Sequence, residues 1–345
     1  MRQLLSQKMN DYLEYIKKIN DETRNSRREV LVNQVYTNKP IKSFGKLESI
    51  GYKISQILGI NKNQVRVSTC IFAGDHGISE LGLSVFEQSQ TKKIVELIGK
   101  GETPVNKICH EANSEIYCFD IGINADVNYS EKIINMKVKK GTRNFLCFDA
   151  LERNEVINAL NKGIEAANIL CKKGVDIVAV GEVGIGNTIS TSIITAILCG
   201  KNAEEVTDVG TGIDNEKLLK KRKIIEEMID KCKSEEQDII TLLQKVGGLE
   251  ICAEAGFIIG CSYHKIIVIL DGYISGTAAL VANEMCPNIS NYIFGSHMSS
   301  EKGHKYIFDK LKLNSIFDMG MHYGLATGSS AALPMYKMAY KIVNK

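Results

Sequence analysis

Five short apolar runs, each ending in or beside a glycine, place the tightest limit on how this chain can fold. The runs are VRVSTCIFAG (65–74), SEIYCFDIG (114–122), VDIVAVG (175–181), KIIVILDG (265–272) and NYIFGS (291–296), and segments with helical periodicity lie between them. Continuous apolar runs of this length are typical of parallel strands that are buried on both faces. The sequence therefore predicts an α/β protein with a doubly wound, mostly parallel sheet.

The first 60 or so residues differ from the rest because they contain helical periodicity and no strand pattern. The segments LLSQKMNDYLEYIKKI and KLESIGYKISQIL carry this periodicity. We expect residues 1–62 to form a mainly helical portion that packs on an α/β domain of residues 63–345. Four prolines in the whole chain and the lack of a Ser/Gly-rich tract argue against a flexible linker, so the two parts are not independent units.

The charge balance and the cysteines limit the classes of binding partner and the cellular compartment that we expect for this protein. Lysine plus arginine number 43 and aspartate plus glutamate 40, so no basic excess predicts nucleic-acid binding. The N-terminal stretch has no apolar core of a signal peptide, and no run of 18 uncharged apolar residues predicts a membrane span. The ten cysteines are scattered without a C-x-x-C pair, which is typical of small buried apolar residues in a reducing compartment. We expect a cytoplasmic protein with a small-molecule partner.

The strongest candidate binding turn is VGEVGIGNT, residues 180–188, where an apolar run meets an apolar helical segment. Glycines without Cβ let backbone N–H groups approach a phosphate closely, and a helix N-terminus favours an anion. A carboxylate at a strand end, here Glu182, is well placed to bind ribose hydroxyls. A tight turn that only packs helix against strand is the alternative, since the glycine spacing matches neither a Walker A loop nor a dinucleotide fingerprint.

Three further turns carry polar residues at strand ends. FAGDHG contains Asp75 and His76, for which local capping with core packing and a functional role both stay open. GTGIDN precedes a lysine cluster from which one lysine can reach a phosphate, and its Asp214 can cap the helix that follows. FGSHMSSEKGH offers Ser296, His297 and Ser299 as hydrogen-bond donors. No spacing of histidines, cysteines and carboxylates matches a known ligand motif, so we predict no metal site.

Seven motifs in unbroken order carry a family resemblance that runs from about residue 38 to the C-terminus. They are FAGDHG, VGEVGIGNT, GTGIDN with its lysines, KVGGLEICAEAG, VILDGYISGTAAL, GSHMSSEKGH and ATGSSAALP. This succession resembles the nicotinate-nucleotide:dimethylbenzimidazole phosphoribosyltransferase family, whose members activate the lower-ligand base in cobalamin and cobamide biosynthesis.

The resemblance implies a Rossmann-like α/β domain with a smaller helical portion, and a dimer. It also implies transfer of phosphoribosyl from nicotinate mononucleotide to a nitrogen of 5,6-dimethylbenzimidazole, which releases nicotinate and yields an α-ribotide. The pyridinium ring of this donor loses its positive charge on departure, so no metal-bound pyrophosphate and no cofactor are expected.

Matching motifs carry the family's site residues onto this chain. The resemblance assigns the donor ribose and phosphate to Glu182, Gly184, Gly186, Asn187, Thr188, Lys221, Ser296 and Ser299. It assigns the base pocket to Ser84, Gln88, Val183 and Leu325.

Leu325 departs from the family pattern. The family's C-terminal loop reads glycine, glutamate, glycine, serine or threonine, glycine, and its glutamate is the general base that takes the proton of the attacking benzimidazole. Here the loop is Gly-Leu-Ala-Thr-Gly, residues 324–328, and the family's K-P-P-G-S-L-G segment is KPIKSFG, residues 39–45. Leucine cannot accept a proton, and a positioned general base contributes ~100- to 10,000-fold in rate. The catalytic residue is therefore not identified by the sequence.

Three explanations of this leucine compete. The chain can be an active transferase with an unusual acceptor, such as a purine or a phenol, and a relocated base (Glu80, Glu87, His322 or a water). It can be one half of a heterodimer with a paralogue, resembling two-subunit relatives that activate phenolic bases. It can also be a non-catalytic regulator that binds nicotinate mononucleotide. The partner subunit is accordingly a second copy in a homodimer or the paralogue.

Overall fold

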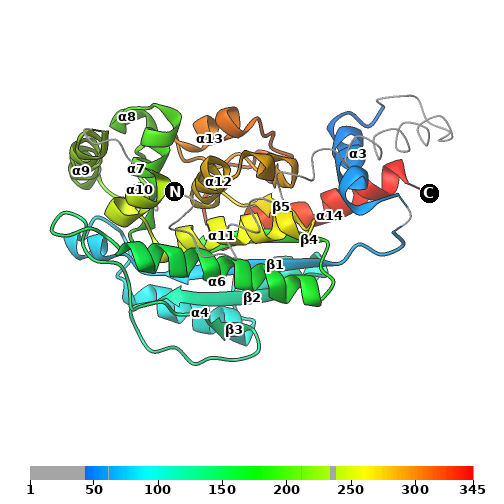
Figure 1. Cartoon of the computed structure of the whole chain (residues 1–345), viewed down its shortest axis with the longest axis horizontal. Coiled ribbons are helices and arrows are strands. Elements are labelled where there is room, and N and C mark those ends of the chain that lie inside the picture. Colours follow the sequence, from blue (N-terminus) through cyan, green and yellow to red (C-terminus); the bar gives the residue numbers. More distant parts are fainter. Residues whose placement is uncertain (1–42, 61, 211, 234–237, 345) are drawn as a thin grey trace.

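A six-stranded, all-parallel sheet forms the centre of the structure (Figure 1), a computed structural model that describes residues 43–60, 62–210, 212–233 and 238–344. The strand order is β3-β2-β1-β4-β5-β6. The strands are β1 (Val67–Gly74), β2 (Glu115–Gly122), β3 (Ile133–Asn135), β4 (Ile177–Val183), β5 (Ile267–Leu270) and β6 (Ile293–Gly295). The predicted doubly wound α/β fold is confirmed. Four predicted apolar runs contain a strand and the run 175–181 overlaps β4, which continues to Val183, whereas β3 was not predicted.

Burial of the strands on both faces explains their continuous apolar sequence. All residues of β1 and β4 are buried, and alternate side chains of each strand point to opposite faces. Cys70 and Phe72 pack in the core with α6 (Arg153–Lys172) and α11 (Leu249–Tyr263), which cover one face. Ile71 and Ala73 face the other side. That side is covered by α4 (Ser89–Lys100), α5 (Pro104–Glu111) and α14 (Thr327–Val343).

The N-terminal part that the structure describes contains one helix. Helix α3 (Lys46–Leu58) packs through Ile54 on Leu333 and Tyr336 of α14. Residues 1–42 of the predicted helical portion lie outside the described residues.

The remaining helices, of which α7 to α10 gather at the carboxyl ends of the strands (Figure 1), complete the described part of the fold. They are α7 (Asn187–Cys199), α8 (Ala203–Val206), α9 (Asn215–Lys233), α10 (Ile239–Val246), α12 (Tyr273–Met285) and α13 (His304–Leu311), with short 3₁₀ turns at Gly77–Leu81 and Pro287–Asn291. Asp214 caps α9 as expected, because its Oδ1 accepts a hydrogen bond from the Lys217 N–H at 2.8 Å.

The strand order reverses between β1 and β4, which pair in parallel from Val67↔Ile177 to Ala73↔Val183. Ligands of such sheets bind beyond the carboxyl ends of the strands at this switch point. The FAGDHG turn follows β1 and the GEVGIGN turn follows β4, so both polar turns lie there. Within the described ranges, no helix is long and apolar enough to cross a membrane.

All ten cysteines are free thiols. Seven are buried, in agreement with their apolar sequence surroundings, whereas Cys147 and Cys171 are exposed and Cys199 is half-buried.

Candidate functional site

The loop after β4 lies directly on the end of β1. A Cβ at Gly184 would lie 2.0 Å from the carbonyl oxygen of Gly74, so only glycine fits this close approach. Gly186 has φ 99° and is the N-cap of α7. Asn187, the first residue of α7, donates a side-chain hydrogen bond to the buried carboxylate of Glu182. The predicted turn therefore brings a carboxylate, two glycines and a helix N-terminus together at the switch point.

Glu182 belongs to a group of four buried carboxyls, which come from two elements and the turn after β5. The others are Glu250 and Glu254 on α11, and Asp271 after β5. Burial raises the pKa of Glu182 well above its usual range, and the negative charges of the other three raise it further. Burial likewise raises the pKa of Glu254 to about 8 and raises the pKa of Asp271. This cluster favours a bound positive charge or protonated carboxyls.

The C-terminal loop packs against the same strand end. The Leu325 N–H donates to the Glu182 carbonyl oxygen at 3.3 Å, and a Cβ at Gly181 would lie 2.2 Å from the backbone nitrogen of Ala326. Leu325 is only 4% exposed and packs in an apolar cluster that contains Val183. The structure thus brings together two of the four residues assigned to the base pocket, and their surroundings are apolar.

Lys221, on α9, is a buried lysine beside the GTG turn, since a Cβ at Gly210 would lie 3.8 Å from its Nζ. It is 2% exposed, and its Nζ donates to the Asp208 carbonyl oxygen at 3.1 Å. Burial lowers the pKa of Lys221, while Glu301 and Asp208 oppose this effect. Among the described residues, its one hydrogen-bond acceptor leaves two N–H donors of the ammonium for an anion.

Ser299 and Ser296 follow β6 and are both buried. Ser299 lies close to Gly272, since a Cβ there would be 3.8 Å from the Ser299 hydroxyl. The Ser296 hydroxyl donates to the carbonyl oxygen of Leu270 at 2.6 Å. Its proton is therefore already used within the fold, whereas the Ser299 hydroxyl accepts a weak contact from the Glu301 N–H at 3.4 Å.

Gln88 and Ser84, the other residues assigned to the base pocket, make local contacts. The Gln88 amide donates to the His76 carbonyl oxygen at 3.1 Å and to Ser79 at 3.0 Å, and it accepts from Asn124 at 2.8 Å. The Ser84 hydroxyl accepts from the Phe86 N–H at 3.2 Å. Gln88 therefore holds the loop after β1, and in this arrangement its polar atoms are engaged.

The side chains named as replacement bases lie at the surface. Glu80, Glu87 and His322 are all exposed. His322 donates from Nδ1 to the Gly320 carbonyl oxygen at 3.1 Å. None of the three is buried beside Leu325 in this conformation.

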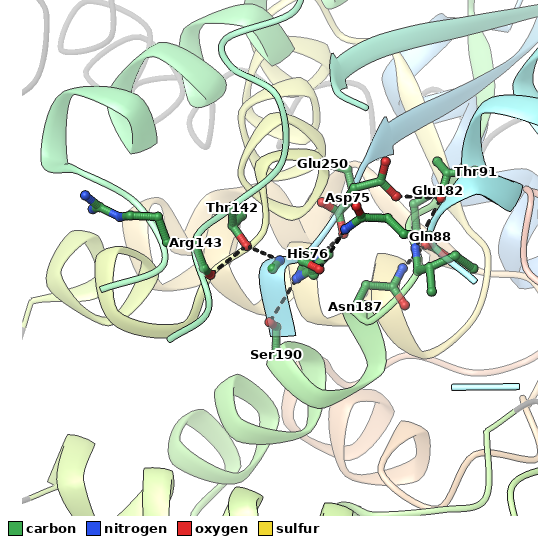
Figure 2. Close-up of polar contacts among 12 residues, drawn as sticks. Asp75, His76, Gln88, Thr91, Thr142, Arg143, Glu182, Asn187, Ser190 and Glu250 are labelled. Carbon is green, nitrogen blue, oxygen red and sulfur yellow. Dashed lines mark hydrogen bonds and ion pairs between the residues drawn. The ribbon is translucent and has the colours of Figure 1, made fainter. Parts of the chain in front are cut away.

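Sequence reasoning singled out Asp75 and His76 but missed their partners (Figure 2). His76 contacts Glu250 through Nε2 at 2.6 Å and Ser190 through Nδ1 at 3.1 Å. Asp75 accepts from the Thr91 hydroxyl at 2.6 Å. The available signal was the pair of glutamates in the otherwise apolar segment GGLEICAEAG, because a charged residue in a buried helix requires a partner.

Comparisons with known proteins agree with this geometry. A family model described as phosphoribosyltransferase matches residues 16–345. The nicotinate-nucleotide–dimethylbenzimidazole phosphoribosyltransferase of Geobacter metallireducens is 36% identical over 308 residues, which cover 89% of this chain and 87% of that protein. The protein of the same name from Desulforamulus reducens is 36% identical over 310 residues, covering 89% and 88%.

A solved structure shows the same architecture. The crystal structure of CobT from Thermus thermophilus superposes with a TM-score of 0.88 at 27% sequence identity, and the match covers 92% of this chain and 96% of that one. Sequence family, fold and coverage agree over nearly the whole length. The chain therefore belongs to the phosphoribosyltransferase family whose curated relatives are named nicotinate-nucleotide–dimethylbenzimidazole phosphoribosyltransferases.

Proposed function

We propose that this protein transfers phosphoribosyl from nicotinate mononucleotide to an aromatic lower-ligand base and forms an α-ribotide for cobamide biosynthesis. The lone pair of an acceptor nitrogen forms a bond to C1′ of the ribose as the C1′–nitrogen bond to nicotinate breaks. The electrons of the broken bond neutralise the pyridinium ring, so nicotinate leaves without a metal or cofactor. An acceptor that carries an N–H must then lose that proton.

The observation that carries this proposal is the loop of Gly184 and Gly186 at the switch point, directly before the N-terminus of α7. Backbone N–H groups of this loop, with Asn187 and Thr188, bind the donor, because a helix N-terminus favours a phosphate. The Lys221 ammonium supplies a positive charge, the Ser299 hydroxyl supplies a hydrogen-bond donor, and Ser296, whose proton is donated to Leu270, lines the cradle. Glu182 binds the ribose hydroxyls.

The acceptor side supports two versions of this function. Val183 and Leu325 give an apolar wall that suits an aromatic ring. We assign the polar side of the base pocket to Ser84 and Gln88, which follow β1 in the chain. No carboxylate stands at residue 325, and the three replacement candidates are exposed. This specific observation favours, as the second candidate, a subunit that binds the donor while a paralogue supplies the base, or a regulator that binds nicotinate mononucleotide without turnover.

Turnover by the purified chain tests the proposal. The assay follows nicotinate release from nicotinate mononucleotide in the presence of a panel of benzimidazoles, purines and phenols. We expect release that depends on one acceptor class. No release with any acceptor, together with normal donor binding by calorimetry, would support the second candidate, and the absence of donor binding would contradict both.

We further propose a cytoplasmic dimer. The ten free cysteines suit a reducing compartment. Sedimentation of the purified chain distinguishes a homodimer from a monomer that requires a paralogue, and a stable monomer that is inactive alone would favour the heterodimer.

A further inference from the structure

His76 lies at the centre of a buried contact that joins three elements beside the loop of residues 184–186, which follows β4 (Figure 2). His76, Glu250 and Ser190 are all completely buried. The first follows β1, the second lies in the first turn of α11 and the third lies near the start of α7. Because a carboxylate can only accept, Nε2 of His76 donates to Glu250, and Nδ1 of the same ring hydrogen-bonds to the Ser190 hydroxyl. One imidazole thus connects both halves of the sheet.

The same residue touches the loop that follows β4. A Cβ at Gly186 would lie 3.1 Å from the His76 Cβ. The backbone N–H of His76 donates to the carbonyl oxygen of Ile185 at 3.4 Å, and the backbone N–H of Ile185 donates to the Thr91 hydroxyl at 3.4 Å. The peptide groups between Gly184 and Gly186 are therefore held from the FAGDHG side by the backbone and Cβ of His76 and by the Thr91 hydroxyl.

Glu250 also contacts the loop that follows β4, at Gly184. A Cβ at Gly184 would lie 3.3 Å from its Oε1, the oxygen that binds His76, and a Cβ at Gly74 would lie 2.8 Å from its Oε2. Among the described residues, Oε2 has no hydrogen-bond partner. A buried carboxylate with a single hydrogen-bonding partner is costly to retain for packing alone.

We propose that His76 is a positioning residue for the donor phosphate, which fixes the backbone N–H groups of Gly184 and Gly186 through its contacts with Ser190 and Glu250. The inference rests on the proposed function, since it names the side chains that hold the phosphate-binding loop in register. Anion binding by backbone N–H groups depends on their alignment, and sub-ångström displacement of a preorganised site weakens it.

Two serines of α7 provide a matched test. Ser190 contacts His76, whereas Ser192, one half-turn away and also buried, donates to the Val206 carbonyl oxygen at 3.0 Å on the far side of the helix. Calorimetry measures the affinity of the full chain for nicotinate mononucleotide and for nicotinate riboside, which lacks the phosphate. The affinity for nicotinate mononucleotide divided by the affinity for nicotinate riboside is the affinity ratio, and it reports the phosphate contacts alone.

We expect Ser190→Ala to lower this ratio by about tenfold, the scale of one misplaced charge-assisted hydrogen bond. Ser192→Ala should lower the thermal midpoint without changing the ratio. His76→Gln, whose amide can still donate to Glu250, should lower the ratio less than His76→Leu. This graded rescue would not accompany a general loss of stability.

Three outcomes are decisive. An unchanged ratio in both Ser190→Ala and a folded His76→Gln overturns the positioning role. An equal fall in Ser192→Ala also overturns it, because the effect would then belong to the helix as a whole. A wild-type chain that binds neither ligand contradicts the proposed function itself. Failure of the positioning role alone would instead leave wild-type binding intact and the affinity ratio unchanged in the variants.

Discussion

Leu325 adopts a backbone conformation that leucine seldom takes. Its φ is 58°, and its neighbours Gly324 and Ala326 have φ values of 76° and 58°. A left-handed conformation costs a non-glycine residue roughly 1–2 kcal/mol. The hydrogen bond from its N–H to Glu182 and the apolar packing with Val183 offset this cost. These contacts therefore hold the loop in a left-handed conformation although the side chain of Leu325 is apolar.

Replacement of Leu325 by glutamate tests whether this side chain alone limits the chemistry. If the pocket accepts dimethylbenzimidazole, Leu325→Glu should raise nicotinate release by ~100-fold or more, because a positioned general base is restored. The new carboxyl would be nearly buried beside Glu182, so its pKa should lie above the usual range and activity should rise with pH.

Leu325→Gln serves as the control, since glutamine has the same shape but cannot take the proton. Equal rates for the two variants, with donor binding intact, would mean that residue 325 does not act as a base here.

At the scale of the element, Asp271 organises the start of α14. Its Oδ1 accepts from the Ser329 N–H at 2.9 Å, and the N–H groups of Gly328 and Ala326 also contact its carboxylate. Asp271 lies after β5, so a strand end caps a helix that is distant in sequence. Asp271→Ala should destabilise the fold by ~1–2 kcal/mol through loss of this cap.

Asp271→Asn keeps an oxygen that can accept from Ser329 and should retain most of that stability. Urea unfolding of both variants measures the difference. Equal destabilisation by alanine and asparagine would show that charge, and not the cap, is what Asp271 contributes to α14.

The strands could be predicted from the sequence because burial on both faces leaves an unbroken apolar run. β3 was missed because three residues that pair only at the sheet edge carry no such run. The glycine loop and the cap by Asp214 were predictable for a related reason, since they depend on local backbone geometry.

The contacts within the site could not be predicted from the sequence. Glu250 and His76 are 174 residues apart in the chain, and only the parallel pairing of β1 with β4 and the docking of α11 bring them together. The side-chain amide of Gln88 forms hydrogen bonds with His76, Ser79 and Asn124. The local sequence around Gln88 does not indicate these partners. Hydrogen bonds between distant segments are set by tertiary packing.

For the whole molecule, the buried carboxyls make stability depend on pH. The pKa of Glu254 is about 8 in the fold, against an ordinary value of 4.5. The unfolded state therefore releases this proton first, so the free energy of unfolding should fall as pH rises from about 5 to about 8, with a slope of at most ~1.4 kcal/mol per pH unit from this group. The raised pKa values of Glu182 and Asp271 act in the same direction.

Glu254→Gln should flatten this dependence and make the protein more stable than wild type near the upper end of that range. Urea unfolding across the range measures it, with the exposed Glu165→Gln as control. An unchanged slope in Glu254→Gln would show that other groups of the cluster carry the dependence.

The β1–β4 pairing also bears on how the protein acquires its site during folding. Val67 pairs with Ile177, about 110 residues later, and the FAGDHG and GEVGIGN turns meet only when this long-range register is complete. Closing such a loop is slow compared with forming the helices on either side of it. Recovery of donor binding should therefore lag behind recovery of helical content on refolding, which makes ligand occupancy a reporter of the last step of assembly.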